Sequence, residues 1–148
     1  MVEAIVKKSF DELTPEELYE ILNLRMTIFI EEQHIIYVDT DFRDQQCDHY
    51  FIKSEGRIIS YLRFLPPHVY DVGEASFGRL VTEKGFRHQG LATALIKYVM
   101  AEHRGEKFVI HAQAYLKDYY ASLGFKVVSA PFLEEDIWHV LMASNNLV

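Results

Sequence analysis

The stretch Ser76-Phe-Gly-Arg-Leu-Val-Thr-Glu-Lys-Gly-Phe-Arg87-His-Gln-Gly90-Leu-Ala92-Thr93 decides the fold. Its first part predicts a strand over 76–82, in which Gly78 favours a bulge. A turn over 85–89 and a helix from Gly90 to about residue 103 follow. Because a helix N-terminus leaves backbone N–H groups unpaired and carries partial positive charge, this strand–turn–helix unit predicts a phosphate-binding site.

Small and cationic residues mark this helix start. Gly90 lets the backbone approach an anion closely, and Ala92 leaves the next turn unobstructed. Lys84, Arg87 and His88 add positive side chains nearby. The chain contains neither Gly-x-x-x-x-Gly-Lys-Ser/Thr nor Gly-x-Gly-x-x-Gly, so the phosphate loops built on those patterns fit worse. The alternative is a turn that only starts an amphipathic helix.

Turn and capping signals divide the rest of the chain into elements. Thr14-Pro15-Glu16-Glu17 has the pattern of a capping box with proline at the first helical position. Glu55-Gly56 predicts a hairpin turn, and Gly124 suits a left-handed helix end. The predicted elements are an edge strand at 2–9, a helix at 15–31, strands at 49–54, 57–65 and 108–112, a helix at 114–123, and strands at 125–129 and 137–143.

This order predicts a mixed α/β fold, with a sheet that carries helices on its faces. Hairpins in the first half imply antiparallel pairing, and strand–helix–strand units in the second half imply parallel crossovers. The apolar spacing of the helix after Gly90 predicts a buried stripe of Leu91, Ala94, Leu95, Tyr98 and Val99.

Length and composition indicate one domain over residues 1–148. Apolar residues make up 49% of the chain and charged residues 25%, which is typical of a globular protein. The net charge of −7 argues against nucleic acid and anionic membrane surfaces as partners. Cys47 is the only cysteine, and the first residues have no long apolar run, so a reducing cytoplasm is the expected location.

A second motif follows the first about 25 residues later. Gln113-Ala-Tyr115-Leu-Lys-Asp-Tyr119-Tyr120-Ala-Ser-Leu-Gly124-Phe125 predicts a helix, a glycine stop and a strand. At this point the chain resembles the GNAT (Gcn5-related) N-acetyltransferases. Arg87-His-Gln-Gly90-Leu-Ala92 is similar to their Arg/Gln-x-x-Gly-x-Gly/Ala pyrophosphate loop, and Tyr120-Ala-Ser-Leu-Gly124-Phe125 to their Tyr-x-x-x-Gly-Phe signature.

A narrower resemblance, to the ElaA-like branch, covers nearly the whole chain. Two positions depart from that branch, since Asp136 and Trp138 stand where its members commonly carry Gly and Pro. These departures affect the shape of the acceptor site rather than the fold. The residues that carry the resemblance are 24–33, Tyr37, Asp41, Asp44, His49, 61–63, Gly78, Arg79, Ala112, Gln113 and 139–142.

The resemblance implies a GNAT fold, a central mixed twisted sheet of six to seven strands flanked by about three to four helices. It implies transfer of an acetyl group from acetyl-coenzyme A (CoA) to a primary amine by direct attack, with no metal. Tyr120 would be the general acid for the departing thiolate. The residues expected to bind the cofactor are Leu80, Val81 and Thr82 at the strand edge, Arg87, His88, Gln89, Gly90, Leu91, Ala92 and Thr93 at the loop, and Gln113.

The acceptor side of the site follows mostly from the same resemblance. A general base is sought among Glu32, Asp41, Glu83, His111 and His139. The residues expected to line the acceptor side are Glu32, Gln33, Tyr37, Asp41, His49, His111 and His139, with Asp44 beside them. Together with the loop cations they suggest one site with an anion-accepting and an amine-accepting end.

Other interpretations of these residues stay open. The acidic run 39–48 has the alternative of a solvated loop, a metal site there fits no calcium loop, and Cys47 lacks a nearby base for a nucleophile. Arg25 and Arg63 are expected to pair with carboxylates inside the protein, with orientation of a substrate carboxylate as the alternative for Arg63.

Two other functions remain as alternatives to the enzyme, namely a CoA-binding sensor module without transfer activity and an acyltransferase that makes a homoserine lactone. A small-molecule or peptide amine is the expected partner. GNAT proteins are often dimers, so a homodimer stays open.

Overall fold

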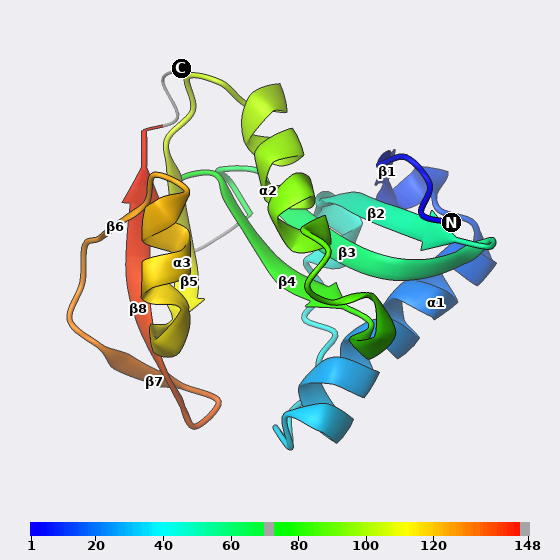
Figure 1. Ribbon diagram of the computed structural model, residues 1–148. Coiled ribbons are helices and arrows are strands. Elements are labelled where there is room, and N and C mark those ends of the chain that lie inside the picture. Colours follow the sequence, from blue (N-terminus) through cyan, green and yellow to red (C-terminus); the bar gives the residue numbers. More distant parts are fainter. Residues whose placement is uncertain (70–72, 146–148) are drawn as a thin grey trace.

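The computed structural model describes residues 1–69 and 73–145, which form two four-stranded sheets and three α-helices (Figure 1). The mixed α/β class predicted from the sequence is confirmed. The eight strands exceed the expected six to seven, because β7 was not predicted. The strands are β1 (Val6–Ser9), β2 (Asp48–Ser54), β3 (Arg57–Leu65), β4 (Ser76–Thr82), β5 (Phe108–Gln113), β6 (Lys126–Val127), β7 (Phe132–Glu134) and β8 (Ile137–Ser144), and the helices are α1 (Pro15–Met26), α2 (Leu91–Glu102) and α3 (Lys117–Ser122).

The first sheet is an antiparallel meander in the order β1-β2-β3-β4. Its β1 edge and the hairpin around Glu55-Gly56 agree with the sequence prediction. Side chains alternate between the two faces, so Phe51 and Tyr61 pack under α1 whereas Tyr50 and Leu62 pack under α2. The two helices therefore cover opposite faces of the same sheet.

Helix α1 begins as the sequence predicts. The Thr14 hydroxyl accepts a hydrogen bond from the N–H of Glu17, and the Glu17 carboxylate accepts one from the N–H of Thr14. The helix predicted over residues 15–31 is divided into two parts. The α-helix α1 stops at Met26, and a π-helix continues over Thr27–Glu32. Such wider turns often occur at functional sites.

The second sheet has the order β5-β8-β6, with β7 on β8. The strand predicted at 125–129 is reduced to two residues, and a tight turn joins β7 to β8. The expected parallel crossovers are only partly correct. All strand ladders among the described residues are antiparallel, and the parallel contact that the structure describes is a single bridge between Ala75 and Phe108.

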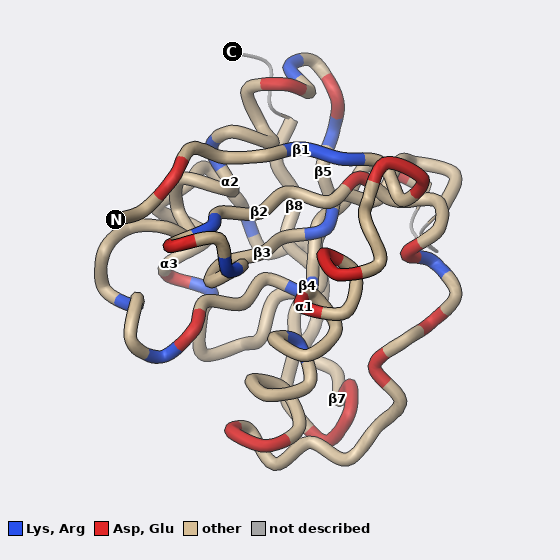
Figure 2. The backbone as a smooth tube through the Cα atoms, turned by 90° about the vertical axis from the view of Figure 1, so that its right-hand side faces the viewer, with Lys and Arg blue, Asp and Glu red and all other residues tan. Residues whose placement is uncertain are grey.

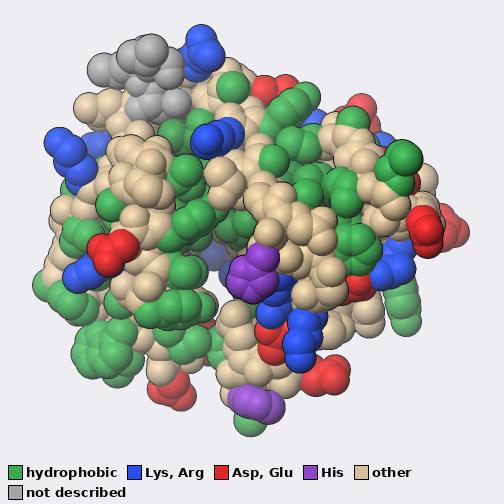
Figure 3. Space-filling model, in the orientation of Figure 1, with side chains coloured by type: hydrophobic (Ala, Val, Ile, Leu, Met, Phe, Trp, Pro, Cys, Tyr) green, Lys and Arg blue, Asp and Glu red, His purple; other side chains and the backbone are tan. Residues whose placement is uncertain are grey.

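Next to that bridge, β4 and β5 separate, and the molecule is hollowed between its two halves (Figures 1 and 3). A bulge in β4 adds to the divergence. Tyr61 pairs with Val81 but Arg63 pairs with Gly78, so β4 has one residue more than β3, and Arg79 takes a positive φ of 49°. The bulge expected at Gly78 therefore lies directly after it.

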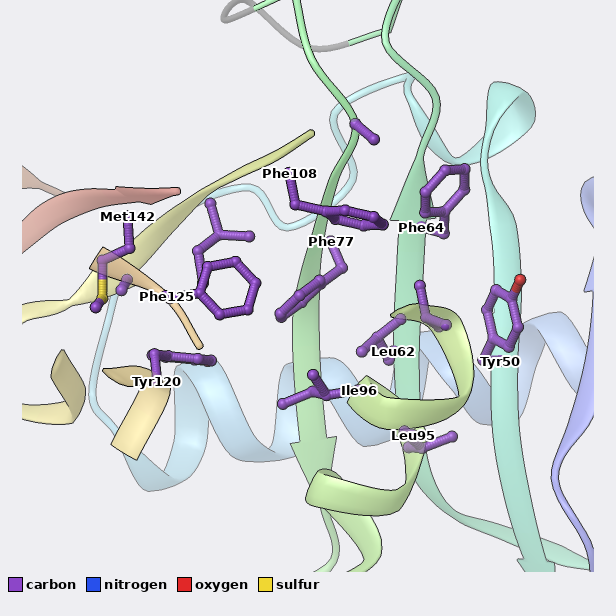
Figure 4. Packing of buried hydrophobic residues seen from close by; sticks show 14 of the residues in the cluster. Tyr50, Leu62, Phe64, Phe77, Leu95, Ile96, Phe108, Tyr120, Phe125 and Met142 are labelled. Carbon is purple, nitrogen blue, oxygen red and sulfur yellow. The ribbon is translucent and has the colours of Figure 1, made fainter. Parts of the chain in front are cut away.

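The main core lies between α2, α3 and the two sheets. Phe77 of β4 points between Tyr120 and Phe125 on one side and the β5 residue Phe108 on the other (Figure 4). The buried stripe of α2 is Leu95, Ile96 and Val99, which corrects the expectation for Ala94 and Tyr98. Both of those side chains are exposed, because the helix is rotated so that Ile96 reaches the core instead.

Candidate active site

A cavity of about 720 Å³ opens between the two halves of the molecule. It is bounded by the bulged part of β4, the start of α2, the end of β5, α3, the π-helical segment and the turn between β7 and β8. Most of the residues predicted for the cofactor and acceptor sides meet here. They are Glu32, Gln33, Tyr37, Leu80, Val81, Thr82, Arg87, His88, Gly90, Leu91, Ala92, Thr93, His111, Gln113, Tyr120 and His139.

The loop before α2 presents its backbone to this cavity. Gly90 is the N-cap residue of α2 with a φ of 77°, and His88 also has a positive φ of 64°. A Cβ atom placed on Gly90 would meet no protein atom within 4 Å. The first helical N–H groups, at residues 91–93, therefore border open space, as a site for an anion requires.

Arg87 does not extend freely from this loop. Its two terminal nitrogens bind the two carboxylate oxygens of Glu32 at 2.5 and 2.9 Å, and its Nε donates to the Thr82 carbonyl at 3.0 Å. This hydrogen bonding lowers the pKa of Glu32. Glu32, expected on the acceptor side, is thus tied to the cofactor loop, whereas Gln89 and Lys84 do not line the cavity.

Tyr120 lies on α3 with only 8% of its surface exposed. Its ring packs against Phe77, Tyr119 and Phe125 while the residue borders the cavity. Burial raises the pKa of Tyr120, so the hydroxyl keeps its proton at neutral pH. The neighbouring Tyr119 hydroxyl lies 2.6 Å from the Thr93 hydroxyl and so ties α3 to the start of α2.

Two histidines and a glutamate meet on the second sheet. His111 Nδ1 lies 2.8 Å from one carboxylate oxygen of Glu134, and His139 Nε2 lies 3.6 Å from the other. The hydrogen bond from His111 lowers the pKa of Glu134. Both histidines were predicted from the sequence but Glu134 was missed, because β7, which carries it, lacks a long alternating pattern.

Comparison with known proteins agrees with this arrangement. Residues 24–145 match the acetyltransferase (GNAT) domain family. A UPF0039 protein of Synechocystis is 33% identical over 138 residues, which cover 90% of this chain and 89% of the relative. Escherichia coli ElaA is 30% identical over 138 residues, which cover 89% of this chain and 90% of ElaA. The chain belongs to the GNAT acetyltransferase family, with ElaA and UPF0039 proteins as homologues.

Solved structures give the same assignment for the fold. The crystal structure of an acyl-CoA N-acyltransferase from Pseudomonas aeruginosa superposes with a TM-score of 0.89 at 32% identity, covering 95% of this chain and 98% of that one. The crystal structure of E. coli ElaA superposes with a TM-score of 0.86 at 26% identity, covering 97% and 99% of the two chains. The cavity of this GNAT domain is accordingly the candidate active site.

The acidic run 39–48 of this GNAT chain matches neither of the two alternatives given for it, a solvated loop and a lining of the acceptor side. Asp39 and Asp44 are buried, and Arg25 forms ion pairs of 2.8 Å with each of them. Arg63 binds both oxygens of Asp41, at 2.8 and 2.6 Å. The run is therefore neither a solvated loop nor an open carboxylate pocket. The expectation that Arg25 and Arg63 hold internal carboxylates is confirmed.

Two residues expected on the acceptor side do not line the cavity. Asp41 is held by Arg63, and the Arg43 and Arg79 side chains lie 3.7 and 3.6 Å from it. Burial raises the pKa of Asp41, but the hydrogen bonds and charge of Arg63, the backbone N–H of Arg43 and the charge of Arg79 outweigh it and lower the pKa. His49 is fully buried, and its two nitrogens lie 2.6 Å from the Tyr61 hydroxyl and 2.9 Å from the Asp44 carbonyl. Both belong to the packing beneath the site because their polar atoms already have partners.

Cys47 is buried, and burial raises the pKa of its thiol to about 12, which leaves no thiolate for nucleophilic attack at neutral pH. Within residues 1–69 and 73–145, no group of three or more His, Cys, Asp or Glu side chains is arranged to hold a metal ion. No helix of the same residues is long and apolar enough to cross a membrane.

The π-helical segment adds apolar residues to the cavity wall that the sequence did not indicate. Ile28 and Phe29 of this segment line the cavity, as do Ile35 just after it and Ile137 of β8. A helix prediction places residues on one face by a period of 3.6, and the wider turn changes which of them face inward. Arg79 also lines the cavity, from the β4 bulge.

Proposed function

We propose that this protein is an N-acetyltransferase that moves the acetyl group of acetyl-CoA to a primary amine of a small molecule or peptide. The observation that carries the proposal is the convergence on one cavity of an open helix N-terminus, a strand edge at a bulge, and the hydroxyl-bearing Tyr120. Membership of the GNAT family supports the acyltransferase chemistry.

In this proposal the cofactor follows the wall formed by β4 and α2. The diphosphate accepts hydrogen bonds from the N–H groups at the start of α2, where Gly90 leaves open space. The pantetheine arm is peptide-like, so it pairs with the edge of β4 at Leu80, Val81 and Thr82, as an added strand does. Gln113 at the end of β5 faces the same cavity and is available to the arm.

The chemical step is direct attack of an uncharged amine on the thioester carbonyl carbon. A carbon–nitrogen bond forms, and a backbone N–H of the β4 edge stabilises the charge that develops on the carbonyl oxygen. When the carbon–sulfur bond breaks, Tyr120 gives its proton to the thiolate. The second amine proton then returns to the tyrosinate, so the tyrosine is restored and the amide is neutral.

A thiol-release assay with acetyl-CoA across a panel of primary amines tests this function. We expect release with at least one amine, and a loss of about 100-fold in kcat for Tyr120→Phe, the lower end of what general acid catalysis contributes. Tyr98→Phe is the matched control, since Tyr98 is a half-exposed tyrosine of α2 outside the cavity.

Each failure of this assay has a distinct meaning. CoA binding without thiol release for any amine would favour a sensor module. A lactone product from a longer acyl-CoA would favour the acyl-homoserine lactone chemistry instead. Full activity of Tyr120→Phe at every pH would leave the transferase standing and remove Tyr120 as its acid.

A further inference from the structure

The hairpin of β7 and β8 places a carboxylate between two imidazoles at the wall of the cavity. Glu134 ends β7 and lies 2.8 Å from His111 of β5 and 3.6 Å from His139 of β8. Phe132 holds both rings, with its own ring at 83° to His111 and nearly parallel to His139. The three groups therefore have fixed orientations before any ligand arrives.

The proton positions on His139 follow from its partners. Its Nδ1 lies 2.8 Å from the Ile137 carbonyl, which only accepts hydrogen bonds, so Nδ1 carries the proton. In the neutral imidazole Nε2 is then an acceptor, and it faces the ionised Glu134 carboxylate at 3.6 Å. Two acceptors oppose each other without a donor between them, and one of them carries a full negative charge.

We propose that Glu134 and His139 form the seat for the ammonium group of the acceptor, with His139 Nε2 as the atom that takes its proton. This inference rests on the transferase function proposed above and adds the residues that receive the amine and the charged form in which it arrives. An ammonium group offers three N–H donors, which suits an anionic and a neutral acceptor side by side. His111 is a positioning residue, since its Nδ1–H fixes the other oxygen of Glu134.

The charges around the seat favour a cation at this place. The carboxylates of Asp39, Asp41 and Asp44 are occupied by arginines, whereas 41% of the Glu134 side chain is exposed. The groups that face Glu134 are His111 from β5, His139 from β8 and the more distant Arg79 from β4, and Glu135 of the same turn also borders the cavity. Glu134 is thus the carboxylate of this wall best placed for an incoming ammonium.

The turn that presents Glu134 is itself strained. Glu135 and Asp136 have φ values of 50° and 61°, a left-handed pair that hairpin turns usually fill with asparagine and glycine. Such conformations persist where the surrounding structure requires them, and they concentrate at functional sites. The tight two-residue connection fixes Glu134 opposite Ile137 and so fixes the carboxylate beside both histidines.

The proton balance of the reaction is complete with these groups. The ammonium gives one proton to His139 Nε2, which becomes an imidazolium beside the Glu134 carboxylate, and the free amine attacks. After product leaves, the imidazolium releases this proton to solvent.

The closing experiment compares Glu134→Gln with Glu16→Gln. Both replace one carboxylate by an amide, but Glu16 is exposed in the first turn of α1 and does not line the cavity. For Glu134→Gln we expect a 10- to 100-fold rise in the KM of the amine, the size of one lost charged hydrogen bond, with the Kd of acetyl-CoA unchanged within about threefold. Glu16→Gln should keep both values. His139→Asn should lower kcat and leave the Kd of acetyl-CoA unchanged within about threefold.

A binding measurement separates this inference from the transferase function. We would follow the imidazole nitrogen signals of His139 by NMR in the CoA-bound wild-type protein while adding n-butylammonium, with n-butanol as the uncharged comparison. A shift with the amine alone, absent in Glu134→Gln, supports the seat even if no amine is acetylated. Unperturbed His139 signals, or acetylation by Glu134→Gln with the wild-type KM, would overturn the seat while the transferase stands.

Discussion

Replacing Gly90 by alanine separates the two demands that the structure places on this residue. Gly90 has a φ of 77°, which an L-residue adopts at a cost of about 1 kcal/mol. It also borders the open space where the diphosphate is proposed to lie, and a Cβ atom there meets no protein atom within 4 Å. The substitution therefore strains the backbone slightly in the free protein and obstructs only the ligand.

The expected magnitudes follow from these two facts. A loss of about 1 kcal/mol corresponds to a fall of about 3 °C in Tm for a chain of this size. A hydrogen bond to a charged group contributes about 1.5–3 kcal/mol, so the loss of one at the diphosphate raises the Kd of CoA about 10- to 100-fold. Thermal unfolding and calorimetric titration with CoA measure the two effects on the same sample.

Gly56→Ala is the matched control for the backbone strain. Gly56 also has a φ of 77°, and a Cβ atom added to it meets no protein atom within 4 Å, but it lies in the β2–β3 hairpin turn, away from the cavity. The two variants should lose the same stability, and only Gly90→Ala should lose affinity. Equal Kd values for both variants would refute the assignment of the α2 N-terminus as the diphosphate site.

Two further predictions concern stability. Asp136→Gly should raise the Tm by about 2–3 °C, because glycine relieves the cost of a φ of 61°, and a lower Tm in thermal unfolding would contradict this reasoning. The N–H of Thr14 and the ammonium groups of Lys8 and Lys53 outweigh burial and lower the pKa of Glu17 to about 2. The carboxylate then stabilises the fold fully above its ordinary pKa of 4.5, and up to about 3 kcal/mol is lost as pH falls from about 4.5 to 2. Denaturant unfolding should show a steeper acid loss for wild type than for Glu17→Gln, and parallel curves would count against the assignment.

The parts of the fold that the sequence predicted are those set by local chemistry. The Thr14–Glu17 capping box, the Glu55-Gly56 turn and the left-handed Gly124 each depend on a few neighbouring residues, and the structure has all three. Most residues expected to bind the cofactor line one cavity for the same reason, since they follow one another from β4 to the start of α2. Tyr120 lines the cavity from α3, and Gly124, with a positive φ of 97°, follows the end of that helix.

The residues expected on the acceptor side come from distant segments, and two of them, Asp41 and His49, do not line the cavity. Glu32 meets Arg87 across 55 residues, and Glu134 meets His111 across 23. Seven histidines and a run of aspartates offered many combinations, and a sequence does not indicate which cation faces which carboxylate. The π-helical turn after Met26 has no comparable local signal, yet it decides which side chains face the cavity.

The number of acidic residues in a stretch of sequence does not show how much negative charge that stretch offers to a ligand. Acidic and basic segments alternate along the backbone (Figure 2). The acidic run at 39–48 is held by arginines of α1, β3 and β4. Arg79 takes part from within the β4 bulge, through a 2.9 Å ion pair with Asp39, so the acidic segment holds the bulge that exposes the strand edge.

Removing one partner of such a buried network costs about 3–5 kcal/mol, whereas a carboxylate already held by arginine has little attraction left for an ammonium ligand. The acids that remain available in the cavity are therefore those with weaker partners, and Glu134 has only imidazoles within 4 Å as ionic partners among the described residues. The sequence suggested one site with an anion-accepting and an amine-accepting end. The proposal keeps these two ends but assigns the amine-accepting end to Glu134 and His139. In the proposed site the amine-accepting end lies on the β7–β8 hairpin, and the arginines that hold the acidic run include Arg79 of the β4 bulge.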